Sequence, residues 1–273
     1  MEIGNKNVVE NLKLIFHLDY SSLTYSIFNT NGNCFEKIKA HNFNATKHSI
    51  IDNIQHIINQ DSQLSKKYNG CLGTVDIGAG TFIPESLFEK SDINHYLNFT
   101  SEIDPNNTCL YTKQNFSNCY SIFQINKRLY EILKQKFNSV KLKHSSSLLV
   151  DYFLHVSKGN NPQLFTTITN NSFHIMLIQN QKFIFYNKFE FSTDDEFLYH
   201  FLNSIKVLEL NTKKTPLYIN SNLEKDHVLF QRLTRHISDF EFMKRPTKFL
   251  YNNEIMEIAD QKNHYLFGQL ICE

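Results

Sequence analysis

The chain has 273 residues, of which 41% are hydrophobic and 14% aromatic, and its net charge is +1 at pH 7. This length suits one large domain or two of ordinary size, with enough apolar residues for a core in each. The small net charge supplies no field that would attract nucleic acid or anionic lipid, and no apolar run approaches the roughly 18 residues of a membrane span.

The cysteines give a first indication of the compartment. They are five in number and form no Cys-x-x-Cys pair, so we expect free thiols and no structural zinc site. The first residues show no basic segment followed by an apolar one, the pattern of a secretory signal peptide. We therefore expect a cytoplasmic protein without a membrane span.

Three strands are predicted at the start of the chain. Apolar and polar residues alternate over residues 12–18 and 23–28, which are joined by the polar corner Asp19–Ser22. The turn Asn29–Asn33 leads to a third strand over residues 35–43. Short polar turns between alternating strands are typical of an antiparallel meander.

A helix and a fourth strand follow the meander. Thr46 is the expected N-cap of the helix, and the strand covers residues 75–77. One apolar stripe at helical spacing would face the sheet, and it consists of Ile50, Ile51, Ile54, Ile57 and Ile58.

The middle of the chain carries further elements before a break. The Lys158–Pro162 segment interrupts the pattern, so we place a domain boundary within residues 145–163, giving domains 1–145 and 146–273. The expected elements are a short helix after Pro84, a loop at 104–107, a strand at 120–125, a basic helix at 126–137, a strand at 140–143 and a helix at 145–156.

The second half repeats the pattern of the first. Leu23 and Phe173 are 150 residues apart, and Phe43 and Phe191 are 148 apart. The repeated elements are strands at 164–168 and 173–178, the corner Thr169–Ser172, a helix after the capping box Thr193–Glu196, and a strand at 217–219. A helix at 225–237, a strand at 240–243 and a helix ending at Glu273 complete the chain.

Two βββαβ copies predict an α/β protein of two tandem ribonuclease-H-like domains. Such a tandem pair is typical of the actin-like ATPase architecture shared by actin, sugar kinases and Hsp70. In this architecture ATP lies between the domains, and the first corner of each copy holds its phosphates. Glycine suits such corners because its backbone can approach a phosphate closely.

Both corners of this chain lack glycine. The first offers Asp19 and Ser21, and the second offers Asn170 and Asn171, which tolerate a positive φ but cannot approach as closely. The Gly-Gly turn expected to hold adenosine is also missing near Asn220–Asn222. We therefore expect no catalytic residue, no metal and no cofactor, and the four corner residues are the only candidates for a cofactor site. The alternative is an ATP-binding protein or ATPase in which Asp19 and these atypical corners hold MgATP.

Residues 75–81 (Val-Asp-Ile-Gly-Ala-Gly-Thr) resemble a phosphate-binding motif but follow the fourth strand instead of joining the first two. We interpret them as a strand-to-helix connection loosened by glycine, with Pro84 in the first turn of the helix. The alternative is an anion site at the N-terminus of that helix.

Other clusters are assigned to structure. A ribonuclease-H-like nuclease needs an inward-facing acid on its first helix beside Asp19 and Asp76, but Asp52 shares the outer face with His48 and His56. We therefore expect no nuclease. The basic stretches 127–143 and 232–248 are interpreted as solvated faces, with nucleic-acid binding as a third, disfavoured function. Residues 145–147 (Ser-Ser-Ser) are interpreted as a helix cap, and the aromatic run 183–191 as a buried strand pair.

The stretch Asn187–Tyr199 resembles the signature of an uncharacterised Bacteroidetes family, a domain of unknown function. Phe82–Pro84 before Leu87–Phe88, and the ending His264–Glu273, are similar to other landmarks of this family. The resemblance implies an actin-like ATPase fold and implies no activity. Together with the glycine-free corners, it predicts a degenerate fold with a non-catalytic scaffold role toward an unknown protein partner.

Overall fold

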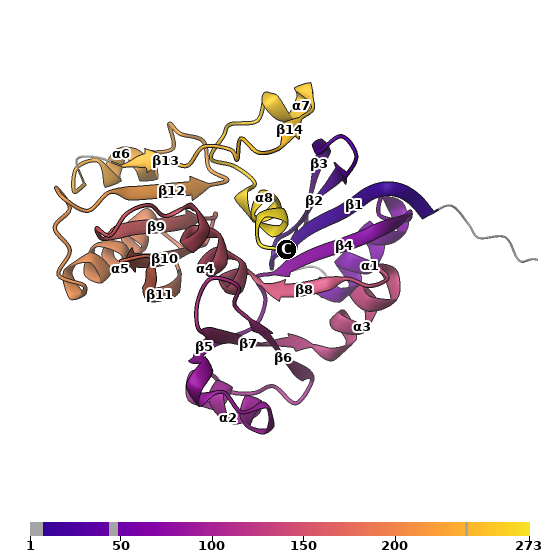
Figure 1. The fold of residues 1–273 in the computed structure, drawn as a ribbon, viewed down its shortest axis with the longest axis horizontal. Helices are drawn as coiled ribbons and strands as arrows, with labels where there is room; N and C mark the ends of the chain where they lie inside the picture. The colour runs from indigo at the N-terminus through magenta and orange to yellow at the C-terminus, as the bar shows by residue number, and fades with distance from the viewer. Residues whose placement is uncertain (1–7, 44–48, 238–239) are drawn as a thin grey trace, which may run out of the picture.

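The computed structural model of the chain describes residues 8–43, 49–237 and 240–273. Its first sheet has the order β14-β3-β2-β1-β4-β8 (Figure 1). The strands β1, β2 and β3 are antiparallel neighbours, whereas β4 runs parallel to β1 and β8 parallel to β4. The strands are β1 (Val8–Leu18), β2 (Ser22–Asn29), β3 (Cys34–Asn42), β4 (Lys67–Val75), β8 (Lys141–His144) and β14 (Leu250–Tyr251).

The predicted isoleucine stripe faces the first sheet. It lies on α1 (Ile50–Gln60), where Ile54, Ile57 and Ile58 are buried in one core with residues of β1, β2 and β4. The second helix of this core is α3 (Lys127–Lys136). Ser49 caps α1 by accepting a hydrogen bond from the backbone N–H of Asp52. The predicted cap, Thr46, lies outside the described residues.

The second sheet has the order β11-β10-β9-β12-β13. Its strands are β9 (Gln163–Ile168), β10 (Ser172–Gln179), β11 (Lys182–Glu190), β12 (Leu217–Ser221) and β13 (Glu241–Phe242). The helices α5 (Asp194–Val207) and α6 (Val228–Leu233) pack on it around an aromatic core that includes Phe173, Phe197 and Phe201. Since α6 ends at Leu233, it is shorter than the helix predicted over residues 225–237.

The two sheets share one strand order. The segment β3-β2-β1-β4-β8 of the first corresponds to β11-β10-β9-β12-β13 of the second. The offsets predicted from the sequence hold at element boundaries, because β2 and β10 begin at Ser22 and Ser172, and β3 and β11 begin at Cys34 and Lys182. This arrangement is the predicted βββαβ pattern in two copies.

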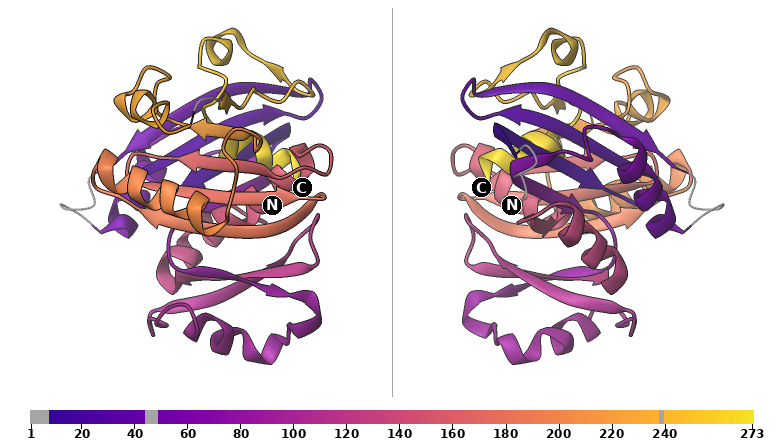
Figure 2. Two further views of the ribbon diagram at one scale, coloured as in Figure 1. Left: turned by 90° about the vertical axis from the view of Figure 1, so that its left-hand side faces the viewer. Right: turned by 90° about the vertical axis from the view of Figure 1, so that its right-hand side faces the viewer.

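A third sheet, β5-β7-β6, is inserted between β4 and α3 and forms the lower part of the molecule in Figure 2. It contains β5 (Gly80–Pro84), β6 (Asn107–Lys113) and β7 (Cys119–Asn126), and α2 (Ile93–Asn98) contacts all three strands. Pro84 therefore ends a strand and is not in the first turn of a helix. Two 3-10 turns, Glu85–Leu87 and Lys90–Asp92, follow it, and the short helix predicted after Pro84 begins only at Ile93, as α2. Neither β5 nor β6 is predicted from the sequence, because both are short and are stabilised by pairing with β7.

Two helices lie between the large sheets. They are α4 (Ser145–Val156) and α8 (His264–Ile271), which pack against each other near the centre of Figure 1. The end of the chain returns to the first sheet, where β14 pairs with β3 and α8 contacts β1 and β4. A short helix, α7 (Asn253–Met256), lies between them in sequence. The predicted boundary within residues 145–163 falls on α4 and stays a prediction.

Three local predictions have clear outcomes. The predicted cap of α5 is confirmed, because Thr193 Oγ1 accepts from the Glu196 N–H, while the Glu196 carboxylate accepts from the N–H of Ser192, one residue before the cap. The serines at 145–147 are not the cap of α4, since His144 Nδ1 accepts from the Ser146 N–H instead. The aromatic run 183–191 is not a strand pair but lies mainly on β11, a half-buried edge strand.

Across the described ranges, no helix is both long and apolar enough to cross a bilayer.

Candidate functional site

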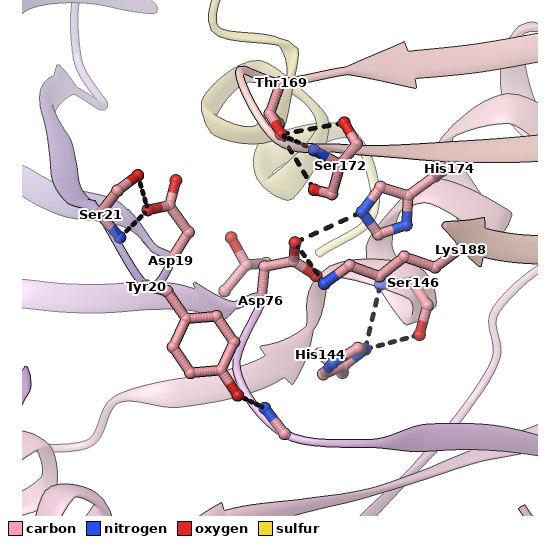
Figure 3. A network of polar contacts seen from close by, with 12 residues as sticks. Asp19, Tyr20, Ser21, Asp76, His144, Ser146, Thr169, Ser172, His174 and Lys188 are labelled. Atoms are coloured by element: carbon pink, nitrogen blue, oxygen red, sulfur yellow. Dashed lines mark hydrogen bonds and ion pairs between the residues drawn. The ribbon is translucent and has the colours of Figure 1, made fainter. Parts of the chain in front are cut away.

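The two predicted phosphate corners face each other across the seam between the domains (Figure 3). They are Asp19–Ser22, between β1 and β2, and Thr169–Ser172, between β9 and β10. Both contribute to one small cavity, which is lined by Asp19, Tyr20, Ser21, Asp76, Thr169, Asn171, Ser172, Lys188 and Glu190. The structure thus brings three of the four predicted candidates together, while Asn170 is exposed and does not line the cavity.

The first corner is closed by its own aspartate. One carboxylate oxygen of Asp19 accepts hydrogen bonds from the backbone N–H groups of Ser21 and Ser22, both at 2.7 Å. The two serine hydroxyls also donate to this carboxylate, each at 2.9 Å. In a glycine-containing corner such N–H groups are free to bind phosphate oxygens. Here the carboxylate of Asp19 already occupies them.

The second corner is closed in a similar way. Thr169 Oγ1 accepts from the backbone N–H of Ser172 at 3.2 Å and lies 2.9 Å from the Ser172 hydroxyl. Asn170 and Asn171 are exposed, and neither has a positive φ. The tight asparagine turn considered from the sequence is therefore not formed. The side chain of Thr169, which is not among the predicted site residues, holds this turn instead.

Asp76 is the central residue of the seam. It follows β4 in the first domain and is 4% exposed. Lys188 of β11 in the second domain places its Nζ 2.9 Å from the Asp76 carboxylate. His174 of β10 places its Nε2 at 3.4 Å from the same oxygen, without the geometry of a hydrogen bond, so we treat this contact as electrostatic. An ion pair thus joins the two domains at the position where the cleft would open.

Charge and burial compete at Asp76. Burial by itself raises the pKa of a carboxyl group, but the neighbouring His174 and Lys188 outweigh this effect and hold the pKa of Asp76 well below its ordinary value. Its other oxygen, Oδ1, is buried and has no hydrogen-bond partner in the described part of the chain. Asp76 is therefore ionised at neutral pH and depends on Lys188 for its charge balance.

Two further histidines surround Asp76. Burial lowers the pKa of His17, and it lowers the pKa of His144 to about 4, although Asp76 opposes both shifts. The ring of His17 stacks on Tyr265 of α8 with centroids 4.0 Å apart, and its Nδ1 lies 3.1 Å from Thr74 Oγ1. Both histidines are consequently neutral at pH 7 and have structural contacts.

The cavity between the corners has a volume of about 20 Å³. A single water molecule needs roughly 10–15 Å³ by this kind of measure, and drug-sized ligands occupy sites of roughly 300–1,000 Å³. The space therefore has room for one water molecule and is too small for a triphosphate in this arrangement of the domains.

The glycine motif at residues 75–81 is part of the same seam but is not an anion site. Gly78 has a φ of +81°, and a Cβ there would lie 2.2 Å from the carbonyl oxygen of Gln124. Its N–H donates to the hydroxyl of Tyr20 at 3.0 Å. Because the motif runs into strand β5, the predicted strand-to-helix connection is wrong, and so is the alternative of a helix N-terminus that binds anions.

The carboxylates of a ribonuclease-H-like nuclease do not converge. Asp19 and Asp76 line one cavity, but Asp52 and His56 are exposed on the outer face of α1, as predicted. Within the described residues there is no group of three or more His, Cys, Asp or Glu side chains that could hold a metal ion. His48 lies outside the described residues.

Comparisons with known proteins place the chain in a family. The model of a family of proteins of unknown function, DUF3822, matches residues 5–240. The chain belongs to this family. No curated protein matches it in sequence.

The fold of this DUF3822 member is similar to that of solved structures. A Bacteroides thetaiotaomicron protein with actin-like ATPase fold and unknown function is 20% identical, with a TM-score of 0.83 over 97% of each chain. A structure of the PilM–PilN type IV pilus biogenesis complex matches with a TM-score of 0.60 and 10% identity over 95% of this chain and 94% of that one. The actin-like ATPase fold, with tandem ribonuclease-H-like domains, is thereby confirmed, as is the predicted resemblance to an uncharacterised family.

Proposed function

We propose that this protein is a non-catalytic member of the actin-like ATPase fold that acts through contacts with a protein partner. The observation that carries the proposal is the filled seam between the domains. There the backbone N–H groups of both corners donate to side chains of the same corners, and the cavity that remains has a volume of only about 20 Å³. A fold that has kept its two domains without a space for nucleotide between them still offers large rigid surfaces. Contacts with a partner are the function that such surfaces support best.

The Asp76–Lys188 ion pair supports the same proposal. In an enzyme that opens and closes around ATP, the seam must separate to admit the nucleotide. Here separation would break the contact between the Asp76 carboxylate, whose side chain is 5% exposed, and its cationic partner Lys188. Loss of this interdomain contact disfavours opening of the seam.

Three further features fit the proposal. The PilM–PilN structure is a complex of a protein of this fold with another protein, which makes a similar role a reasonable model for this chain. The common strand order of the two sheets supports an origin by internal duplication. All five cysteines are free, which suits a reducing compartment such as the cytoplasm.

The test is release of inorganic phosphate from MgATP by the purified full-length chain. We expect no release above that of a buffer control, for the wild type and for Asp19→Ala alike. Phosphate release by the wild type that is lost in Asp19→Ala would refute the non-catalytic role.

A second function, ATP binding at the seam, has one observation in its favour. The carboxylates of Asp19 and Asp76 and the ammonium of Lys188 line the same cavity, and such groups can hold Mg²⁺ and phosphate. It requires the domains to separate and the Asp76–Lys188 pair to break. A structure of the chain crystallised with MgATP and showing a nucleotide between the corners would establish it.

A further inference from the structure

A second and larger concave site lies in the second domain, away from the seam. This groove has a volume of about 610 Å³ and runs between the end of α4, the strands β9, β12 and β13, and residues 243–248. It shares no lining residue with the cavity between the corners. Its volume is within the range of roughly 300–1,000 Å³ that is usual for ligand sites.

The floor of the groove is apolar. It includes Val156, Phe165, Tyr218, Met243 and Ile271, of which Phe165 and Met243 are buried and the other three half-buried. Phe165 stacks between Phe153 and Tyr218, with ring centroids 4.9 and 5.1 Å away. Since both faces of this ring are covered by protein, the floor suits aliphatic or aromatic side chains better than the stacking of a nucleobase.

The rim of the groove is basic. Lys158, Lys244 and Lys248 are exposed, and over the described part of the chain none of their ammonium groups has an ion pair with an acid. Lys248 lies over the ring of Phe249, 4.9 Å from its centroid. Glu241 is the one acidic residue of the lining. The chain as a whole has a net charge of only +1, so this rim is a local concentration of positive charge.

Arg245 gives the groove a rigid, cationic wall. Its side chain is 6% exposed, its guanidinium lies 4.9 Å from the ring centroid of Tyr251, and Nη2 donates to the carbonyl oxygen of Ile258. Asp260 is 3.5 Å away but is itself 54% exposed and only partly balances the charge. The Nε of Arg245 is buried and, among the described residues, has no hydrogen-bond partner, so this side chain contributes positive charge beneath the groove surface and no free donor to a ligand.

We propose that this groove binds an acidic peptide segment of a protein partner, with carboxylates at the lysine rim and apolar side chains on the aromatic floor. The proposal rests on the interaction role proposed above and names the surface and the chemistry through which that role is carried out. Complementary charge would steer the segment to the groove, and the floor would retain it. A nucleic acid is the less suitable occupant, because the rings of the floor are already stacked on one another.

The experiment is fluorescence polarisation with the full-length chain and a fluorescein-labelled peptide of alternating Asp and Leu residues. We expect saturable binding that weakens as the salt concentration rises. The charge-reversed variant Lys244→Glu/Lys248→Glu should bind the peptide at least about tenfold more weakly, because repulsion replaces attraction at two rim positions. Both lysines are exposed, and neither forms an ion pair with an acid among the residues that the structure describes, so the variant should unfold at the wild-type temperature.

The matched control is Lys213→Glu/Lys214→Glu, which reverses two exposed lysines outside the groove and should leave binding unchanged. The proposal is overturned by absence of saturable binding to the wild type, or by equal weakening in both double variants. Tighter binding of a labelled oligothymidine strand than of the peptide would also overturn it.

The groove and the non-catalytic role can fail separately. Phosphate release measured on the same preparations tests the role alone. If the chain binds the peptide at the lysine rim and also hydrolyses ATP, the groove proposal stands and the non-catalytic role is refuted. A chain that neither binds the peptide nor hydrolyses ATP would refute the groove proposal and leave the non-catalytic role standing.

Discussion

The ion pair between Asp76 and Lys188 is a contact at which one substitution should lower the stability of the fold. The carboxylate of Asp76 is almost fully buried, and Lys188, whose side chain is 23% exposed, is its cationic partner across the seam. Breaking a buried pair by removing one partner typically costs about 3–5 kcal/mol. Because Lys188 retains access to water, the cost here should lie below that range.

We therefore expect Asp76→Asn to lower the free energy of unfolding by about 2 kcal/mol, measured by urea denaturation at pH 7. The control is Asp226→Asn, at an exposed carboxylate, which should change it by less than about 0.5 kcal/mol. Equal stabilities of the two variants would contradict the role assigned to Asp76.

Two buried histidines predict that the stability of the fold depends on pH. The pKa values of His144 and His264 are both lowered to about 4, from 6.5, mainly by burial. Between these values the unfolded chain binds more protons than the folded one, so the stabilisation is complete above pH 6.5 and is lost as the pH falls toward 4. The loss should reach about 1.4 kcal/mol per pH unit for each histidine. Asp76 behaves differently, since its lowered pKa stabilises the fold above about pH 4 and this contribution is lost only in stronger acid.

Urea denaturation at pH 7.5 and at pH 5.5 tests this account. The wild type should be less stable at the lower pH, and the difference should shrink in His144→Gln/His264→Gln. A wild type that is equally stable at both pH values would show that these histidines are not buried in their neutral form.

Within the first sheet, β1 and β4 approach each other closely at one glycine. Gly73 of β4 is the register partner of Phe16 of β1, and a Cβ at Gly73 would lie 2.3 Å from the Phe16 ring. The ring is fully buried and packs on Phe137, with centroids 5.2 Å apart, so it has little room to move.

We expect Gly73→Ala to lower the free energy of unfolding by about 1–3 kcal/mol, the usual cost of overpacking a core, measured by urea denaturation. Gly32→Ala is the control, because a Cβ at Gly32 would have no neighbour nearer than 3.7 Å. Similar losses in the two variants would mean that chain entropy, and not the Phe16 ring, decides the effect.

Elements with strong local signals could be predicted from the sequence, and those made by long-range pairing could not. The isoleucine stripe of α1 and the capping box of α5 each fix a helix through residues a few positions apart. By contrast, β5 is defined by its pairing with β7, whose partner residues lie about forty positions away, so Gly80–Pro84 was interpreted as part of a connection to a helix. The same reason explains β14, a two-residue strand that joins β3 from the far end of the chain.

The candidate site was predicted in part. Both corners and their missing glycines are evident in the sequence, but Thr169 closes the second corner, and not the predicted Asn170 or Asn171. Lys188 and His174 were missed, because their importance depends on the packing of two domains and not on spacing within one. In the sequence, Lys188 is the one basic residue of the run 183–191, where Asn187 and Glu190 are also polar.

At the scale of the whole molecule, the end of the chain ties the domains together. Gln269 of α8 donates to the carbonyl oxygen of Phe16 at 2.9 Å, while Tyr265 stacks on His17. On its other side α8 packs on α4, where Tyr152 OH lies 2.9 Å from His264 Nδ1. One helix is thus part of the packing of both large sheets.

Chains with two domains commonly unfold in separate steps. Because α8 and the Asp76–Lys188 pair couple the domains here, we expect one cooperative transition in urea, with coincident curves from tyrosine fluorescence and far-ultraviolet circular dichroism. Two resolved transitions would show that the domains are stable independently of the seam.

The filled seam itself is tested most directly by isothermal titration of the full-length chain with MgATP. The account predicts no binding heat at millimolar nucleotide, for the wild type and for Asp19→Ala. Micromolar binding by the wild type that disappears in Asp19→Ala would contradict it, because that result requires a triphosphate to enter the space that Asp19, Asp76 and Lys188 now fill.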